Sequence, residues 1–168
     1  CDRILLAPLY PQYCAATTAT VVDKASEWLG EQRWQPSMRT LPPYHDDPLY
    51  IDALAADLQR QLDDLDFAPL LLRSFHGMPA RTLELGDPYH CHCQKTARLL
   101  EAKLAQPGLR FRTSFQSRFG RAKWLEPATD AVLVQEAQGG TKRIAIAAPG
   151  FSADCLETLE ELAIQGRE

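Results

Sequence analysis

The amino-acid sequence predicts an α/β fold: a Rossmann-like parallel sheet of four to five strands with helices on both of its faces. Short apolar runs of strand length alternate with longer stretches whose apolar residues recur at helical spacing. Prolines and glycines stand at many of the boundaries between these segments. With 168 residues and 45% hydrophobic content, the chain suits one core better than two. We therefore expect a single α/β domain over residues 1–168.

The first expected elements are a strand, a helix and a second strand. The apolar run at 4–9 is closed by prolines, which is typical of a strand buried on both faces of a parallel sheet. Apolar residues at helical spacing predict a helix within 17–34, and Thr17 or Thr18 can cap its start. Residues 37–41 predict a second strand, which a pair of prolines ends.

The rest of the chain continues the alternation. An amphipathic pattern predicts a helix over 47–65, with Asp47 as its cap and Pro48 in its first turn. The apolar run at 69–75 predicts the third strand. The same reasoning predicts, in order, a helix at 88–105, a strand at 109–115, a helix at 127–138 stopped by Gly139-Gly140, a strand at 143–148 and a helix at 154–165. Right-handed crossovers bring the loops after such strands to one edge of the sheet, so functional residues should follow the strands directly.

Composition excludes several classes of protein. The net charge of −4 argues against nucleic-acid binding, which usually needs a basic patch or stripe. No apolar run approaches the roughly 20 residues that cross a bilayer. The cysteines are odd in number and lack CxxC spacing, which predicts neither a disulfide framework nor a zinc ribbon and favours a reducing compartment. Since the chain opens on Cys1 and enters a strand at once, we expect an excised or truncated piece.

The loop after the third strand carries the best-placed general base. His76 stands at the expected sheet edge, with a glycine and a proline shaping the turn behind it. Imidazole can exchange a proton near neutral pH and can bind a metal ion when neutral. From position alone a structural role is as well supported as a functional one, although ligand groups often sit on such loops.

The segment after the last strand adds carboxylates. Glu157 falls in the first turn of the expected helix, where the helix dipole stabilises a negative charge, and Glu161 lies one turn further on the same face. A solvated acidic face is the simpler interpretation of this pair. Together with His76, however, the two loops could bring nitrogen and oxygen ligands to one mouth, suited to a divalent cation or to proton transfer.

The sequence resembles the ferrochelatases, the enzymes that insert ferrous iron into porphyrins. Five segments carry the resemblance in the family's order: SFHGMP at 74–79, GDPY at 86–89, FQSRFG at 115–120, WLEP with Thr129 at 124–129, and PGF running into DCLETLEE at 149–161. The opening LYPQY at 9–13 also looks like the start of the family's second domain. This resemblance implies the C-terminal half of a ferrochelatase, without its N-terminal domain and its C-terminal tail.

The resemblance implies a porphyrin cleft between two similar α/β domains. His76 and Glu157 then take the positions of the family's catalytic histidine and glutamate and are both candidate iron ligands, and Glu161 matches a further acidic, metal-binding position. Two pyrrole protons must leave the macrocycle as iron enters, so a base and a carboxylate that tolerates a cation are needed beside the ring. Which of His76 and Glu157 holds iron and which takes protons stays open at this point.

Three further residues are expected to bind porphyrin by the same resemblance. Trp124 is expected to contact the porphyrin ring, although an indole packed in the core or on the surface is an equally good interpretation. Arg118 could meet a propionate through a bidentate contact, although most arginines are solvated surface groups. Tyr13 belongs to the LYPQY segment and joins this set.

Two departures from the family limit what the resemblance implies. Cys155 stands where some members have histidine, and Gln165 stands where some continue an acidic ladder, which puts an iron path along this helix in doubt. With the other half absent, one wall of the cleft is missing and the fragment should be inactive alone. The apolar surface left uncovered should make it prone to self-association.

The run His90-Cys91-His92-Cys93 invites a metal-site interpretation. Residues two apart near a helix start do not share a face, however, and the resemblance makes this stretch an ordinary helix. Some relatives carry an iron-sulfur cluster, but its usual cysteines lie largely in the absent tail. We therefore expect no iron-sulfur cluster and no required cofactor, with Fe²⁺ and porphyrin as substrates.

Two other functions stay open. The chain could be a non-catalytic metal- or tetrapyrrole-binding module, or it could come from a related cobalt chelatase, although the segments at 115–120 and 154–159 favour ferrochelatase. The resemblance implies a bacterial, cytoplasmic protein, with peripheral association to the inner membrane as an alternative. The physiological porphyrin, protoporphyrin or coproporphyrin, is not specified by the sequence.

Overall fold

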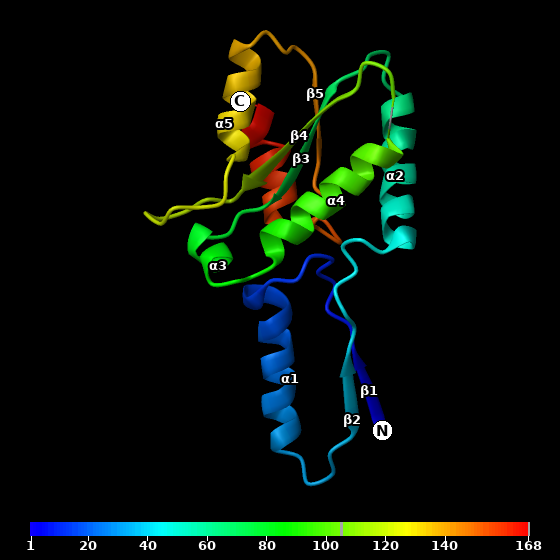
Figure 1. Ribbon diagram of the computed structural model, residues 1–168, viewed down its shortest axis with the longest axis vertical. Coiled ribbons are helices and arrows are strands. Elements are labelled where there is room, and N and C mark those ends of the chain that lie inside the picture. Colours follow the sequence, from blue (N-terminus) through cyan, green and yellow to red (C-terminus); the bar gives the residue numbers. More distant parts are fainter. Residues whose placement is uncertain (105, 168) are drawn as a thin grey trace.

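The computed structural model describes residues 1–104 and 106–167 and divides into a body and an arm (Figure 1). The body comprises residues 48–104 and 106–167. The arm comprises residues 1–40 and projects from one end of the body, so that the N-terminus lies far from the C-terminal turns.

The body is built on three parallel strands in the order β4-β3-β5. The central strand, β3 (Leu70–His76), pairs with β4 (Arg110–Gln116) along its whole length and with β5 (Ile144–Ala147) over its first half. All of β3 is buried except the partly exposed His76. The short apolar run therefore forms a strand covered on both faces, as the sequence predicted.

Helices cover both faces of this sheet, which confirms the α/β class. On one face, α2 (Pro48–Asp63) and α4 (Tyr89–Lys103) bury their apolar sides against Leu71 and neighbouring residues. The other face carries α5 (Thr129–Gln138) and the C-terminal turns η2 (Glu157–Leu162) and η3 (Gln165–Arg167). A short helix that the sequence analysis missed, α3 (Ala80–Glu84), follows β3.

The arm corrects the expectation of one continuous sheet. Its strands, β1 (Arg3–Leu6) and β2 (Ser37–Thr40), pair in parallel as a separate two-stranded sheet. The prediction that β1 is buried on both faces is wrong, because Leu5 is 66% exposed. Trp34, in the turn before β2, is 73% exposed. The apolar pattern predicted a strand, which forms, but the described residues do not cover it.

Helix boundaries also differ at two places. A π-helical turn, η1 (Ala15–Ala19), precedes α1 (Thr20–Gly30), and the Thr17 hydroxyl donates to the Cys14 carbonyl instead of capping the helix. The expected C-terminal helix forms as η2 and η3 instead of one regular α-helix. At the start of α2, Asp47 caps as predicted.

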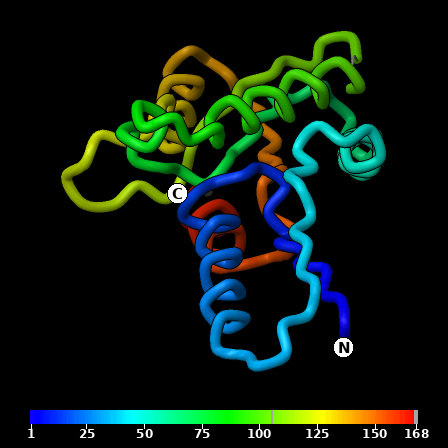
Figure 2. Tube along the Cα trace, turned by 60° about the horizontal axis from the view of Figure 1, so that its bottom comes forward, coloured from blue at the N-terminus to red at the C-terminus, as the bar shows by residue number. Residues whose placement is uncertain are grey.

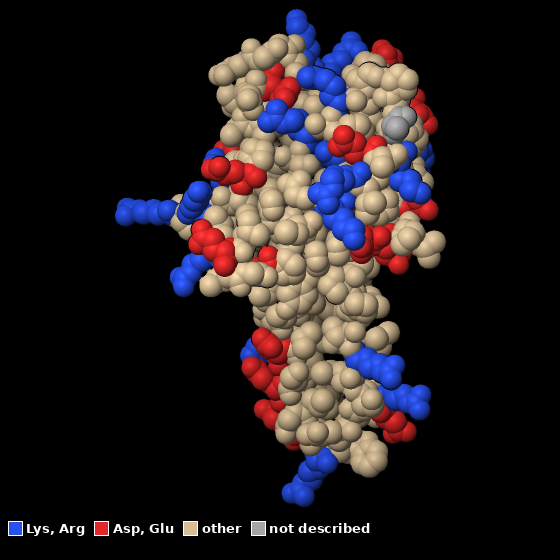
Figure 3. All heavy atoms as spheres, in the orientation of Figure 1, with Lys and Arg blue, Asp and Glu red and all other residues tan. Residues whose placement is uncertain are grey.

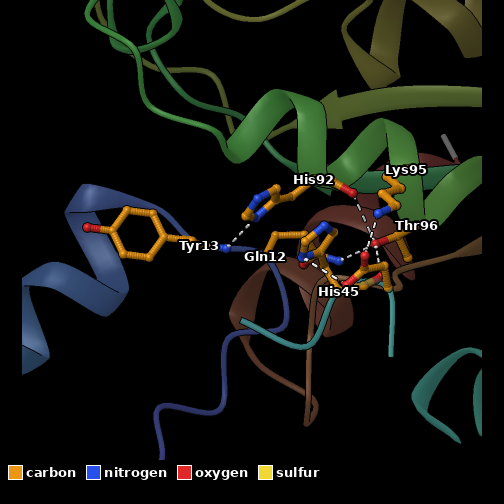
Figure 4. A network of polar contacts seen from close by, with 7 residues as sticks. Gln12, Tyr13, His45, His92, Lys95 and Thr96 are labelled. Atoms are coloured by element: carbon orange, nitrogen blue, oxygen red, sulfur yellow. Dashed lines mark hydrogen bonds and ion pairs between the residues drawn. The ribbon is translucent and has the colours of Figure 1, made fainter. Parts of the chain in front are cut away.

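The arm joins the body through a polar junction against α4 (Figure 4). The Gln12 amide donates to the Thr96 hydroxyl at 3.1 Å, and that hydroxyl also lies 2.7 Å from the His45 carbonyl. The Tyr13 backbone N–H donates to Nδ1 of His92 at 3.2 Å, so this nitrogen must be unprotonated. The rings of His45 and His92 stack with centroids 3.6 Å apart.

Burial is the main cause that lowers the pKa of both junction histidines. The neighbouring His92 lowers the pKa of His45 further, whereas Asp46 raises it and Lys95 lowers it. For His92, Asp46 and Asp87 raise the pKa and Lys95 lowers it. Both imidazoles are therefore neutral when the junction is formed at neutral pH.

Acidification should weaken this junction. Because the folded-state pKa values are lowered, the histidines contribute stability above the unfolded value near 6.5, and this stability is lost as pH falls through the folded values. Protonation of His92 also removes the acceptor for Tyr13, a loss of about 1 kcal/mol. Urea unfolding at pH 7.5 and 5.5 should show a lower midpoint in acid for wild type and a smaller decrease for His92→Gln. Equal decreases in both proteins would contradict this account.

Charge is mixed over the surface. On the face shown in Figure 3, basic and acidic residues are interspersed over the body and the arm, and no continuous basic stripe is visible on that face. Among the described residues, no helix is both long enough and apolar enough to span a bilayer.

Candidate functional site

A cavity of about 610 Å³ lies where the arm meets the body, beside the end of β3. Figure 2 shows the chain that follows β5 passing beside the start of the arm, where Ser152 donates to the Leu9 carbonyl at 2.5 Å. His76 and Glu157 both line this cavity. Its size is typical of a small-molecule site. The structure thus brings together the two residues that the sequence analysis assigned to catalysis.

His76 reaches the cavity because it is the last residue of β3. Its Nδ1 lies 2.6 Å from the Gly77 carbonyl oxygen. A carbonyl can only accept a hydrogen bond, so Nδ1 carries the proton and Nε2 of the neutral ring has a free lone pair. The buried Tyr89 hydroxyl donates to the His76 carbonyl at 2.9 Å and fixes the end of the strand. This arrangement leaves Nε2 able to accept a proton or bind a metal ion.

Gly77 must be a glycine because the chain passes too close to β4. Its N–H donates to the Gln116 carbonyl at 2.7 Å, and a Cβ at this position would lie 2.5 Å from the same carbonyl oxygen and 3.2 Å from the Trp124 ring. The glycine and the proline after His76 predict a turn, but no sequence pattern indicates this close approach to β4.

Gly77→Ala should therefore displace the His76 loop. The backbone of β4 cannot yield as a side chain could, so we expect a loss of about 1–3 kcal/mol in the free energy of unfolding. Urea denaturation measures this, and Gly30→Ala is the matched control because a Cβ there meets nothing within 4 Å. Equal stabilities of the two variants would contradict the account.

Glu157 opens η2 and supplies the negative charge of the cavity. Its pKa is lowered, first by a hydrogen bond from Cys155, then by its own backbone N–H and by the charge of His76 when protonated, while slight burial opposes these effects. The carboxylate is therefore ionised at neutral pH.

Most of the remaining cavity wall is apolar or aromatic. These side chains were not predicted as site residues from the sequence. They come from the arm, the loop after β3, α4 and the segment after β5: Leu9, Tyr10, Cys14, Met78, Tyr89 and Phe151. Only the fold places them together, although all of them except Cys14 lie within segments that carried the resemblance. Burial raises the pKa of Cys14, so its thiol stays protonated.

Glu161 does not share this cavity. Its carboxylate accepts from the backbone N–H of Ser117 at 2.6 Å and from the Ser117 hydroxyl at 2.5 Å. Ser117 has a φ of 63°, a conformation that non-glycine residues rarely adopt, and the carboxylate stabilises that turn. Glu161 instead lines a separate hollow of about 390 Å³ beside α5.

The three expected porphyrin contacts also lie outside the cavity. Trp124 is buried and donates its indole N–H to the Phe119 carbonyl at 3.0 Å. Arg118 forms an ion pair with Asp130 at 2.5 Å and is half exposed. Tyr13 uses its backbone at the junction, and in Figure 4 its ring points away from the histidine pair.

The His90-Cys91-His92-Cys93 run diverges around α4. His90 stacks on Phe115, His92 stacks on His45, Cys93 is buried and Cys91 is exposed. Among the described residues, no group of three or more histidine, cysteine or acidic side chains converges on a possible metal position.

The cavity therefore offers one imidazole nitrogen and one carboxylate at the mouth of an apolar, aromatic wall. A larger hollow of about 730 Å³ lies along β5, but neither His76 nor Glu157 lines it. The smaller cavity suits a flat apolar ligand whose polar centre exchanges protons or meets a divalent cation.

Comparison with known proteins identifies the family of the chain. The family model described as ferrochelatase matches residues 1–168. The chain belongs to the ferrochelatase family. This confirms the resemblance, and the α/β fold with parallel strands is consistent with that of the ferrochelatase family.

Similar ferrochelatases come from several bacteria. The ferrochelatase of Rhizobium meliloti (strain 1021) is 60% identical over 169 aligned positions, which cover 100% of this chain and 50% of that protein. Those of Agrobacterium fabrum and Nitrobacter hamburgensis are 56% and 51% identical, each over 100% of this chain and 49% of the relative. The chain thus spans about half the length of the ferrochelatases it matches.

Proposed function

We propose that the chain is one half of a ferrochelatase and carries the residues that exchange Fe²⁺ for the two pyrrole protons of a porphyrin. The observation that carries this proposal is the convergence of His76 and Glu157 on one apolar cavity, in a chain of the ferrochelatase family. The macrocycle fits the apolar wall, and its reacting nitrogens need a base and an anionic group beside them.

The geometry favours a division of labour that the sequence left open. Nε2 of His76 has the free lone pair and accepts one pyrrole proton at a time; it releases the first proton to water before the second N–H bond breaks. Glu157 has a lowered pKa, which makes it a weak base but a persistent anion, so it attracts Fe²⁺ and offsets its charge as it approaches the ring. Two protons leave and one dication enters, so charge is conserved.

Other expected residues take secondary places in this proposal. Trp124 and Arg118 line a hollow of about 400 Å³ next to the His76 loop, where they can meet the polar edge of a bound porphyrin. Glu161 acts through the Ser117 turn and binds metal only if that turn opens. No cofactor and no iron-sulfur cluster is required, and we place the protein in the bacterial cytoplasm, with peripheral membrane association as an option.

The arm is the surface on which we place the other half of the enzyme. Its parallel two-stranded sheet has open edges, and parallel sheets are normally covered on both faces. Leu5, Trp28 and Trp34 are exposed on it. The relatives are about twice as long as this chain, which supplies enough additional protein for a partner domain and a second cleft wall. Alone, the chain should self-associate through this surface.

The test is anaerobic addition of Fe²⁺ and protoporphyrin to the full-length enzyme and to the 168-residue chain, followed by the porphyrin absorbance spectrum. We expect iron insertion by the full-length enzyme and negligible insertion by the chain alone. Binding without insertion by the full-length enzyme would favour a non-catalytic tetrapyrrole-binding module. Insertion of Co²⁺ in strong preference to Fe²⁺ would favour a cobalt chelatase.

A further inference from the structure

We propose that Gln116 is a positioning residue, which holds both the His76 loop and the Glu157 segment at the cavity, the first through its backbone and the second through its buried side chain. The inference rests on the proposed function, since it concerns the same two residues. Gln116 is the last residue of β4, pairs in register with His76, and is 2% exposed.

The Gln116 side chain faces Glu157. Its Nε2 donates to the Glu157 backbone carbonyl at 3.0 Å. Because that carbonyl only accepts, the amide nitrogen must point to it, and Oε1 must point back into the protein, where the Ser74 hydroxyl donates to it at 2.6 Å. The orientation of the amide is therefore determined at both ends.

A directional relay supports this orientation. The Ser74 hydroxyl donates its proton to Gln116, so towards Thr129, 2.9 Å away, Ser74 can only accept. Thr129 then donates to Ser74 and accepts from the Ser114 hydroxyl at 2.9 Å. All four side chains are buried. Each hydroxyl donates in the same direction, which is the arrangement in which hydrogen bonds polarise one another.

The Gln116 backbone holds the His76 loop. Its carbonyl accepts from the Gly77 N–H at 2.7 Å, directly beside His76. One residue therefore bonds the strand end that presents the imidazole and the turn that presents the carboxylate. Loss of its amide should release Glu157 alone, because the backbone bond to Gly77 survives substitution.

The experiment compares Gln116→Leu, Thr129→Val and their combination in the full-length enzyme, with Gln61→Leu as control because Gln61 is exposed on α2. We expect Gln116→Leu to lower kcat for iron insertion by about 10–100-fold, with the porphyrin Kd and the melting temperature nearly unchanged. Thr129→Val should lower kcat less, and the double variant should match Gln116→Leu, because both act through one relay. Amide hydrogen exchange over 157–162 should rise severalfold in Gln116→Leu.

Two results would overturn the proposal. In one, Gln116→Leu keeps the wild-type kcat. In the other, kcat and the melting temperature fall while the porphyrin Kd rises, which indicates a merely structural role. A wild-type enzyme without iron insertion, or a fully active Glu157→Gln, would instead defeat the proposed function. Hydrogen exchange over 157–162 then still decides whether Gln116 holds the Glu157 segment, since unchanged exchange would exclude it.

Discussion

His76→Ala in the full-length enzyme should reduce iron insertion by on the order of 10³-fold, the largest effect that we expect from a single side chain. Among the described residues that line the cavity, His76 supplies the imidazole base through Nε2, since its Nδ1 is committed to Gly77 and the ionised Glu157 is a much weaker base. Without the imidazole, water must accept the pyrrole protons. Initial rates of metalation, measured anaerobically at saturating porphyrin, give the ratio to wild type.

The control for this prediction is His90→Gln. His90 lies on α4, is partly exposed and stacks on Phe115 instead of lining the cavity. We expect its rate to stay within about threefold of wild type, in the range of a surface substitution. If both histidine variants lose activity equally, or if His76→Ala remains active while porphyrin still binds, His76 is not the base.

Glu157→Gln should reduce kcat on the order of 10²-fold while porphyrin affinity changes little, because the substitution keeps the shape and removes the charge. The hydrogen bond from Cys155 that lowers the pKa of Glu157 then no longer has a charged acceptor. The apparent KM for Fe²⁺ should rise together with the loss in kcat. Steady-state rates over a range of Fe²⁺ concentrations separate the two parameters.

Glu160→Gln is the matched control on the same turn. Glu160 is exposed and bonds only the Gln165 side chain among the side-chain contacts of the described residues. We expect near wild-type kinetics from it. If the KM for Fe²⁺ rises equally in both variants, the total negative charge of this segment attracts iron, and the Glu157 carboxylate has no specific role.

The body was predictable from sequence because its signals are local. The fully buried β3 is a continuous apolar run, and the start of α2 carries Asp47 followed by Pro48, so both elements agree with the structure. The arm was not predictable in this way. The run in β1 looks the same as a run inside a covered sheet, and composition cannot tell which strands will share a sheet when the covering surface comes from elsewhere.

The site was predictable in part for a similar reason. His76 and Glu157 could be found because loops after parallel strands share one edge, and because the segments around them resemble ferrochelatases. The role of Glu161 depends on the positive φ at Ser117, which no sequence pattern announces for a serine. The relay through Gln116 joins residues far apart in the chain, so only the folded structure shows it.

The most direct test of the central claim is a crystal structure of the full-length enzyme with protoporphyrin bound. The account predicts the macrocycle in the 610 Å³ cavity, with Nε2 of His76 facing the ring nitrogens and the Glu157 carboxylate beside them. A ring seated in the 730 Å³ hollow along β5, or beside Glu161 and Arg118, with His76 and Glu157 out of reach of its nitrogens, would contradict it.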